Sequence, residues 1–199
     1  MRAKKDNQKG MFMNLIKKAT AIITLTVLST AFTACEDNRN CDFNAASNTL
    51  SCPEKNYATI TINGKTWMAE NLDVYVPESS TCYDNNHKNC ETAGRLYTWQ
   101  AASESVCPTG WELPTREDFK TAFGNTPIAD LNKITNFNLQ FAGFKYFDGK
   151  FADKEISASF WTKEPYDDSR AYLIRATNTT ITYEHYNKNI FASVRCIKK

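Results

Sequence analysis

The sequence predicts an α+β domain in which two helices come first and short mixed or antiparallel strands follow. Residues 95–105 and 115–123 read as helices, whereas the chain from Phe137 onward is rich in aromatic and β-branched residues divided by Asn, Asp and Gly turns. Helices and strands that are segregated along the chain are typical of this class. With 42% hydrophobic residues, 23% charged residues, 7 Gly and 6 Pro, the composition excludes a collagen-like or low-complexity chain.

The earliest regular element is a β-hairpin at residues 57–68. Hydrophobic and polar residues alternate along 58–68, and Asn63-Gly64 stands in the middle of this stretch. Asn-Gly is a strong turn signal between two alternating strands, because both residues accept a positive φ.

The helix at 115–123 carries a start signal of its own. Thr115 follows Pro114 and is the expected N-cap, and Asp118 takes the position that Glu holds in a capping box. The strands expected after this helix lie around Phe141–Phe147, Phe160–Thr162, Ala171–Ile174, Thr180–Tyr183 and Phe191–Arg195.

Three parts are expected along the chain. Residues 1–34 are interpreted as a lipoprotein signal peptide, and residues 35–56 as a polar tether with a small cysteine loop, because this stretch is rich in Asn, Asp and Ser. Residues 57–199 contain no composition shift and no internal repeat, which favours a single folded domain.

A basic stretch ending at Lys17-Lys18 is followed by the uncharged residues 19–34 and then by Cys35. This order is typical of a signal peptide, since the uncharged run is shorter than the ~20 residues that span a bilayer. The small residues before Cys35 resemble a lipobox, in which the cysteine is acylated and becomes the mature N-terminus. Phe32 departs from this pattern, because an aliphatic residue is usual at its position.

Two alternatives stay open at this end of the chain. An ordinary signal peptide cut after Ala31 or Ala34 would leave Cys35 as a plain thiol. Translation from Met11 or Met13 instead of Met1 would give a more typical signal length. With acylation, we expect an outer-membrane lipoprotein that faces the periplasm or the cell surface, and whose partner is the membrane.

The cysteine count supports the lipid anchor. The chain has seven cysteines, and an odd cysteine in an exported protein needs an explanation. If Cys35 is acylated, six remain, which pair without remainder in an oxidising compartment. They are Cys41, Cys52, Cys82, Cys90, Cys107 and Cys196.

Charge argues against a nucleic-acid partner. Six of the 24 basic residues and one of the 22 acidic residues lie in 1–34, which leaves 18 basic and 21 acidic residues after it. A net charge of −3 beyond residue 34 is unsuited to neutralising a phosphate backbone.

An ordered series of short motifs runs through most of residues 57–198. These are Trp67–Leu72 (WMAENL), Cys82–Asn85 (CYDN), Cys90, Gly94–Trp99 (GRLYTW), Cys107–Thr115 (CPTGWELPT), Phe160–Thr162 (FWT) and Ser193–Cys196 (SVRC). Together they resemble the Fibrobacter succinogenes major paralogous domain, a family of exported bacterial proteins. The resemblance implies a C-type-lectin-like fold, distantly similar to formylglycine-generating (sulfatase-modifying) domains, and it implies no defined biochemical activity.

The six remaining cysteines allow fifteen pairings. Cys41 and Cys52 share the polar segment, and Cys82 and Cys90 enclose a polar turn, so both pairs are local. These two pairs leave Cys107 with Cys196. This bond would link the turn before the helix at 115–123 to the last strand, which also resembles how C-type-lectin-like folds are braced. We therefore expect the pairs Cys41–Cys52, Cys82–Cys90 and Cys107–Cys196.

Most of the motif residues have a structural interpretation. The four tryptophans Trp67, Trp99, Trp111 and Trp161 are expected to pack in the core. Pro114, with Pro108, fixes a bend before a helix. Asn71 and Arg95 are polar within apolar surroundings and are expected to hold loops by hydrogen bonds to the backbone. Arg195, in the last motif, is counted with this structural set.

Metal and nucleophile chemistry find little support. Cys82, His87 and Cys90 offer three zinc ligands at short spacing, but no fourth stands nearby and a disulfide is favoured. The second histidine, His185, lies in an alternating segment, and neither histidine has a recognisable catalytic context. The copper oxidase chemistry of formylglycine-generating enzymes needs two late cysteines, whereas only Cys196 follows Cys107.

One loop weakly resembles a lectin calcium loop. Glu164-Pro165-Tyr166-Asp167-Asp168 has Tyr166 where calcium-binding loops have Asn, and no Trp-Asn-Asp strand follows it. A solvated acidic turn is the preferred interpretation, so we expect no metal and no cofactor.

The sequence therefore favours an exported, lipid-anchored envelope protein of unknown specific activity, with a non-catalytic binding or structural surface module. The ligand would be a surface protein or a glycan. The alternative is a hydrolase acting on extracellular polysaccharide or envelope glycans. The chain has enough acidic residues to supply the pair of carboxylates that such an enzyme uses. A pocket with converging carboxylates would favour the enzyme, and an exposed aromatic patch would favour binding.

Overall fold

A computed structural model describes residues 40–104, 106–124 and 136–199. The expected signal peptide and Cys35 lie outside these residues. Strands make up 41% of the described structure and helices 16%, and the strands form two curled sheets. The expected α+β class with a C-type-lectin-like layout is therefore wrong. The helices of the domain are short. Between them lie two-residue strands, which form because they pair with strands from distant parts of the chain.

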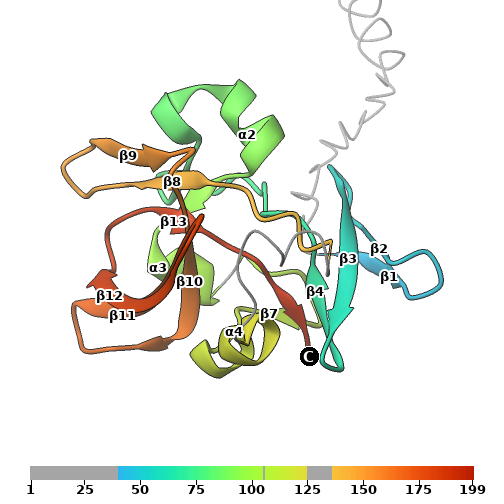
Figure 1. Cartoon of the computed structure of the whole chain (residues 1–199). Coiled ribbons are helices and arrows are strands. Elements are labelled where there is room, and N and C mark those ends of the chain that lie inside the picture. Colours follow the sequence, from blue (N-terminus) through green and yellow to red (C-terminus); the bar gives the residue numbers. More distant parts are fainter. Residues whose placement is uncertain (1–39, 105, 125–135) are drawn as a thin grey trace, which may run out of the picture. The chain divides into compact units, whose positions relative to one another are not determined.

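The first sheet begins with two consecutive hairpins. Its strands are β1 (Asp42–Asn44), β2 (Thr49–Ser51), β3 (Asn56–Ile62) and β4 (Lys65–Met68), followed in space by β14 (Ile197–Lys198) and β7 (Trp111–Glu112). The predicted turn at Asn63-Gly64 joins β3 to β4, with φ of 48° and 81° at the two residues. Figure 1 shows the C-terminal strand running between β4 and β7.

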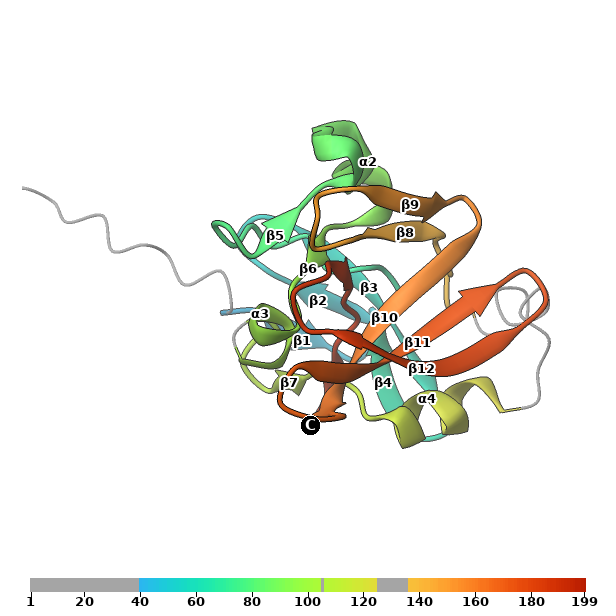
Figure 2. The same ribbon diagram turned by 90° about the vertical axis from the view of Figure 1, so that its left-hand side faces the viewer.

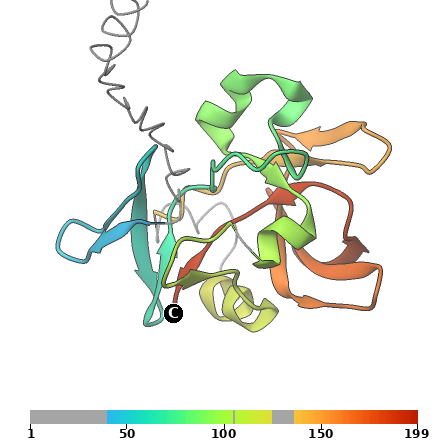
Figure 3. The same cartoon turned by 180° about the vertical axis from the view of Figure 1, so that it is seen from behind.

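The expected tether is largely part of this sheet. β2 pairs antiparallel with β3 over Thr49–Ala58 to Ser51–Asn56, and Leu50 is fully buried. Figures 1 and 3 show the β1–β2 hairpin beside β3. The described residues all belong to one compact unit. Polar composition concealed a hairpin that buries one apolar residue and is closed by a disulfide.

The second sheet contains the long C-terminal strands. Its order is β12 (Ile181–Asn187), β11 (Arg170–Thr177), β10 (Ser157–Pro165), β13 (Ala192–Ser193), β6 (Leu96–Tyr97) and β5 (Ser80–Thr81). Strand β8 (Ala142–Lys145) pairs with β10 and with β9 (Phe151–Lys154). Strands were expected in the regions that form β8, β10, β11, β12 and β13.

Among the described residues, four short helical segments lie between the strands. They are η1 (Tyr83–Asn85), α2 (His87–Ala93), α3 (Trp99–Glu104) and α4 (Arg116–Phe123). The helix expected at 95–105 starts only at Trp99, because Leu96 and Tyr97 pair with β13 and β5. Figure 2 shows α4 against β11 and β12. Within the described ranges, no helix is long and apolar enough to cross a bilayer.

The start of α4 has the predicted capping box. Thr115 Oγ1 accepts a hydrogen bond from the Asp118 N–H at 3.1 Å, and Asp118 Oδ2 accepts one from the Thr115 N–H at 2.8 Å. Lys65 on β4 donates to the second oxygen of the same carboxylate. The box therefore also joins the helix to the first sheet.

An aromatic core lies between α4 and the two sheets. Trp67 packs on Phe119 and Phe137 with ring centroids 5.1 and 5.8 Å apart, and Phe119 stacks on Phe160 at 5.8 Å. All four side chains are at most 1% exposed. A second buried cluster surrounds Trp161 on the other side of the second sheet.

The tryptophans mostly serve the core. Trp67, Trp111 and Trp161 are at most 4% exposed, and the Trp161 indole donates to the Tyr97 carbonyl at 2.7 Å. Trp99 is half-buried and its indole donates to the Thr162 carbonyl at 2.9 Å. Pro114 is buried at the bend, where its carbonyl accepts from the Lys163 N–H.

Three disulfides join Cys41 to Cys52, Cys82 to Cys90, and Cys107 to Cys196. These are the three expected pairs. The first closes the β1–β2 hairpin, and the second ties η1 to α2. The third spans 89 residues and links the turn before β7 to the residue that directly precedes β14.

Candidate functional site

A polar pocket of about 350 Å³ opens between the first hairpins and α2. Four separate parts of the chain contribute to it: the β2–β3 turn, the loop after β4, helix α2 and the residue before β6. We call it the Asp73–Arg95 pocket. Its lining residues are Glu54, Lys55, Asp73, Tyr75, His87, Glu91 and Arg95.

Gly94 makes the floor of the pocket possible. It has a φ of +72°, and a Cβ built there would lie 2.7 Å from the Asn71 side chain and 2.8 Å from the Leu72 carbonyl. Only glycine lets the chain pass this close. As a result the Arg95 N–H donates to the Leu72 carbonyl at 2.9 Å, which places Arg95 next to Asp73.

Two buried tyrosines hold the loop that carries Asp73. The Asp73 N–H donates to the Tyr57 hydroxyl at 3.1 Å, and the Val74 N–H donates to the Tyr97 hydroxyl at 2.8 Å. The Tyr97 hydroxyl in turn donates to the Val74 carbonyl. Burial raises the pKa of Tyr57 to about 12 and that of Tyr97 as well, so both hydroxyls stay neutral at physiological pH.

Asp73 and Arg95 form an ion pair at the bottom of the pocket. Asp73 Oδ1 lies 3.1 Å from Arg95 Nε, and the two side chains are only 16% and 13% exposed. Both atoms are shielded from solvent and have no partner besides each other within the described part of the chain. Burial raises the pKa of Asp73, and the positive charge of Arg95 opposes this shift.

An exposed aromatic ring forms the rim. Tyr75 is 59% exposed, and the Arg95 guanidinium carbon lies 5.1 Å from its ring centre. Helix α2 contributes His87 and Glu91 to the lining, and these two side chains pair at 3.3 Å one turn apart. The pocket therefore combines charged groups at its base with an apolar ring face at its mouth.

The pocket does not offer a metal centre. No group of three or more His, Cys, Asp or Glu side chains close enough to hold a metal ion occurs among residues 40–104, 106–124 and 136–199. The zinc arrangement of Cys82, His87 and Cys90 is ruled out by the disulfide between the two cysteines.

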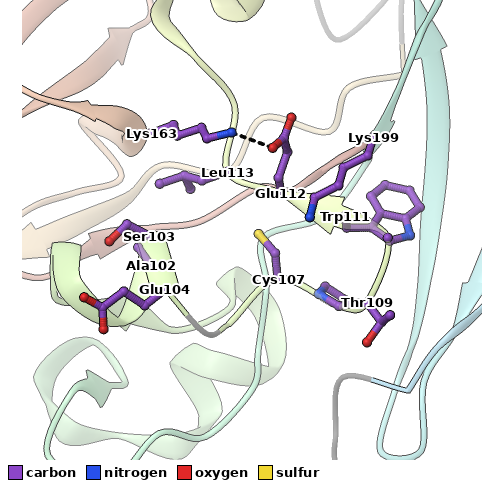
Figure 4. Close-up of a pocket in the computed structure, with 12 residues that line it drawn as sticks. Ala102, Ser103, Glu104, Cys107, Thr109, Trp111, Glu112, Leu113, Lys163 and Lys199 are labelled. Atoms are coloured by element: carbon purple, nitrogen blue, oxygen red, sulfur yellow. Dashed lines mark hydrogen bonds and ion pairs between the residues drawn. The ribbon is translucent and has the colours of Figure 1, made fainter.

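A second hollow, of about 330 Å³, lies between the end of α3 and the turn from Cys107 to Leu113 (Figure 4). Lys163 reaches from β10 and donates to the Glu112 carboxylate at 2.6 Å. The aromatic residue of its lining, Trp111, is buried, so this hollow lacks the exposed ring of the Asp73–Arg95 pocket and is the weaker candidate.

An aromatic cluster lies on the β10–β11 turn and β12. Tyr166 stacks on His185 with centroids 3.9 Å apart and meets Tyr172 edge-on at 5.3 Å. Arg116 lies 3.6 Å from the Tyr172 ring centre, and Arg170 lies 4.7 Å from that of Tyr166. Tyr166 is 43% exposed and His185 is exposed too, but their ring faces stack on each other, so part of the apolar surface of the cluster is used within the domain.

The loop that resembles a calcium loop is occupied by internal contacts. The Glu164 carboxylate accepts from the Arg116 N–H, and Asp167 accepts from the Ser169 and Arg170 N–H groups. The Arg170 guanidinium also binds Asp167 and lowers its pKa. Calcium ligation would have to displace these bonds.

Of the structural residues named from the sequence, Arg95 lines the pocket and the others do not. Asn71 holds a loop as expected, because its amide donates to the Ala93 carbonyl at 2.9 Å. The Arg95 side chain was expected to do the same and instead pairs with Asp73. Asp73 and Tyr75 were missed; the signal available was the lone charge of Asp73 inside the otherwise apolar run Leu72–Val76.

Residues 60–126 match the model of the Fibrobacter succinogenes major domain, as the motifs predicted. The match covers about a third of the chain and contains five of the seven pocket residues. No curated protein and no solved structure matches the chain.

Proposed function

Because residues 60–126 match the model of the Fibrobacter succinogenes major domain, we propose that the protein is an exported, lipid-anchored module of the cell envelope. Its task is to bind a ligand in the Asp73–Arg95 pocket without catalysing a reaction. The single observation that carries the binding role is the ion pair with unmet hydrogen-bonding capacity at the pocket floor.

Export is supported by the cysteines. All six cysteines of the described residues are joined in disulfides, which persist in oxidising compartments. Cys35 is left over at the end of the uncharged stretch 19–34. An acylated Cys35 would tether the domain to the outer membrane through two or three acyl chains, enough for a stable anchor.

The anchor is tested by changing Cys35→Ser. We expect the wild-type chain to sediment with membranes after a carbonate wash, and the variant to be released. Mass spectrometry of the purified chain should find acylated Cys35 as the first residue. A variant that stays in the washed membranes, or a mature chain that begins elsewhere, would contradict the lipid anchor.

Binding is supported by the physics of the pocket floor. A partly buried charged pair whose outer oxygen and N–H groups have no protein partner gains free energy when a ligand supplies the missing hydrogen bonds. Pockets that combine a few directed polar groups with an apolar wall are the usual form of small-ligand sites.

The binding role is tested with the full-length chain in detergent on a glycan array and against purified envelope proteins. The variant Tyr75→Ala removes the exposed rim, and Phe147→Ala is its matched control, because Phe147 is 73% exposed and lies outside the pocket. We expect a ligand whose binding is lost in the first variant and kept in the second. Equal binding by all three proteins would contradict the pocket as the site.

A hydrolase is the second candidate, and one observation favours it. Three carboxyl groups line the pocket, those of Glu54, Asp73 and Glu91, and burial raises the pKa of Asp73 as a general acid requires. Release of reducing ends from polysaccharide, abolished by Asp73→Asn with folding intact, would support the hydrolase over the binding module.

A further inference from the structure

We infer that the Asp73–Arg95 pocket takes a neutral sugar residue and grips two neighbouring hydroxyl groups of its ring. This inference rests on the proposed binding function of the same pocket and names the class of ligand.

The pocket floor presents an acceptor beside a donor. The Asp73 carboxylate can only accept hydrogen bonds when ionised, and the Arg95 guanidinium can only donate them. The two atoms that face each other, Asp73 Oδ1 and Arg95 Nε, lie 3.1 Å apart and are closed off from solvent. A ligand therefore meets the second Asp73 oxygen and the Arg95 Nη groups, which make no hydrogen bond within the described residues. A ligand that fits must therefore donate and accept at adjacent positions.

Vicinal hydroxyl groups meet this requirement. Each hydroxyl has one donor and two acceptor lone pairs. One hydroxyl can donate to Asp73 while its neighbour accepts from Arg95, and both bonds are charge-assisted and hence stronger than neutral ones. A sulfate or a doubly ionised phosphate ester offers only acceptors, so it would leave the Asp73 carboxylate unpaired and repelled.

The charge of the pocket also disfavours an anion. Its wall contains the three carboxylates of Glu54, Asp73 and Glu91 against the two cations of Lys55 and Arg95. Lys55 is further engaged by Glu70, outside the lining, at 3.3 Å. No excess of positive charge remains to attract an acidic ligand.

The rim supplies the apolar surface that a sugar ring needs. Tyr75 exposes 59% of its surface at the mouth of the pocket. A pyranose carries hydroxyls on its edge and C–H groups on its faces, so the ring can lie on Tyr75 while its edge reaches the floor. The volume of about 350 Å³ lies at the small end of ligand sites, which favours one sugar residue rather than a long chain.

The test is calorimetric titration of the full-length chain with methyl α-D-mannopyranoside, methyl β-D-galactopyranoside and methyl β-D-glucopyranoside, with D-glucuronate as the anionic counterpart. We expect at least one neutral pyranoside to bind and glucuronate to bind more weakly. Removing one hydroxyl of the gripped pair, in the 2-deoxy, 3-deoxy or 4-deoxy form of that sugar, should weaken binding about tenfold or more, since each lost charge-assisted bond is worth over 1.4 kcal/mol.

Two variants locate the binding. Asp73→Asn keeps the shape of the floor and removes the charge, and it should weaken the sugar about tenfold. Tyr75→Ala changes an exposed ring, so folding is preserved, and it should also weaken the sugar. Phe147→Ala should bind as the wild type does. Sugar binding that survives both pocket variants would overturn the inference.

The outcomes separate this inference from the proposed function. If a pocket-dependent ligand of another class is found on the array or among envelope proteins while no neutral pyranoside binds, the sugar assignment is wrong and the binding module stands. If no ligand of any class depends on Asp73 or Tyr75, both fall.

Discussion

Arg195 donates a hydrogen bond from Nε to Oδ1 of Asn71, 2.8 Å away, although the two residues are 124 positions apart. Both side chains are at most 1% exposed. The guanidinium also donates to the carbonyls of Phe137 and Asn138, and burial lowers its pKa to about 9. One cation thus ties the loop after β4, the segment before β8 and the C-terminal strands together without a carboxylate.

We predict that Asn71→Ala destabilises the domain by about 3 kcal/mol, because it leaves a buried cationic donor without its acceptor. The Asn71→Ala/Arg195→Met double variant has no buried cation. Its free energy of unfolding should therefore fall by at least ~1 kcal/mol less than the sum of the decreases in the two single variants. Urea unfolding of the four proteins measures this coupling. Strictly additive losses would show that the hydrogen bond contributes nothing.

The capping box gives a pH-dependent prediction. Burial raises the pKa of Asp118, but hydrogen bonds from Lys65 and Thr115 outweigh it and bring the pKa below its ordinary 3.8. Stability from a carboxyl with a lowered pKa is present above the unfolded-state pKa and is lost as pH falls through the folded-state pKa. Asp118→Asn should therefore cost about 1 kcal/mol at pH 7 and progressively less below pH 3.8. A difference that is constant with pH would refute the role of the charge.

The disulfides should differ in their contribution to stability. The chain-entropy account assigns roughly 4.6 kcal/mol to closing the long loop of Cys107–Cys196 and roughly 2.6 kcal/mol to the short loop of Cys82–Cys90, both as upper values. The Cys107→Ser/Cys196→Ser double variant should therefore melt well below the Cys82→Ser/Cys90→Ser double variant. Non-reducing peptide mapping checks the pairing itself, and a Cys107 peptide linked to anything but Cys196 would contradict it.

Removing metal ions should leave the fold unchanged. The Cys82 and Cys90 thiols are consumed in a disulfide, and the oxygens of Asp167 are engaged by Ser169 and Arg170. Thermal melts with and without EDTA should coincide. A large downward shift with EDTA, reversed by added Ca²⁺ or Zn²⁺, would reveal a structural metal.

Features that depend on neighbouring residues could be predicted from the sequence. The turn at Asn63-Gly64 and the capping box of Thr115 and Asp118 each lie within a few residues, so their signals are complete in a short window. The pairs Cys41–Cys52 and Cys82–Cys90 are local in the same sense.

The fold class could not be predicted, because it depends on distant pairing. β6 has only Leu96 and Tyr97, and these are a strand because β13 and β5 bond to them from other parts of the chain. Ile197 likewise belongs to a sheet only through Trp67 and Glu112. A strand of two residues shows no alternation of polar and apolar residues. The sequence therefore underestimates the share of strands and overestimates the share of helices.

The candidate site escaped prediction for a related reason. Asp73 and Arg95 meet because Gly94 lets the chain approach Asn71 and Leu72, and this approach has no local signature beyond a glycine. Tyr75 reads as an ordinary aromatic residue until its exposure is known.

Hydrogen–deuterium exchange of the full-length chain, with and without the pyranoside that binds in the titration, shows directly whether the ligand occupies the Asp73–Arg95 pocket. With the sugar bound, we expect slower exchange in residues 72–76 and 90–95, which carry the floor and rim of the Asp73–Arg95 pocket. Exchange around the aromatic cluster of Tyr166, Tyr172 and His185 should not change. Protection confined to residues 164–172 and 183–186, with none at 72–76, would place the site on the cluster and contradict the account.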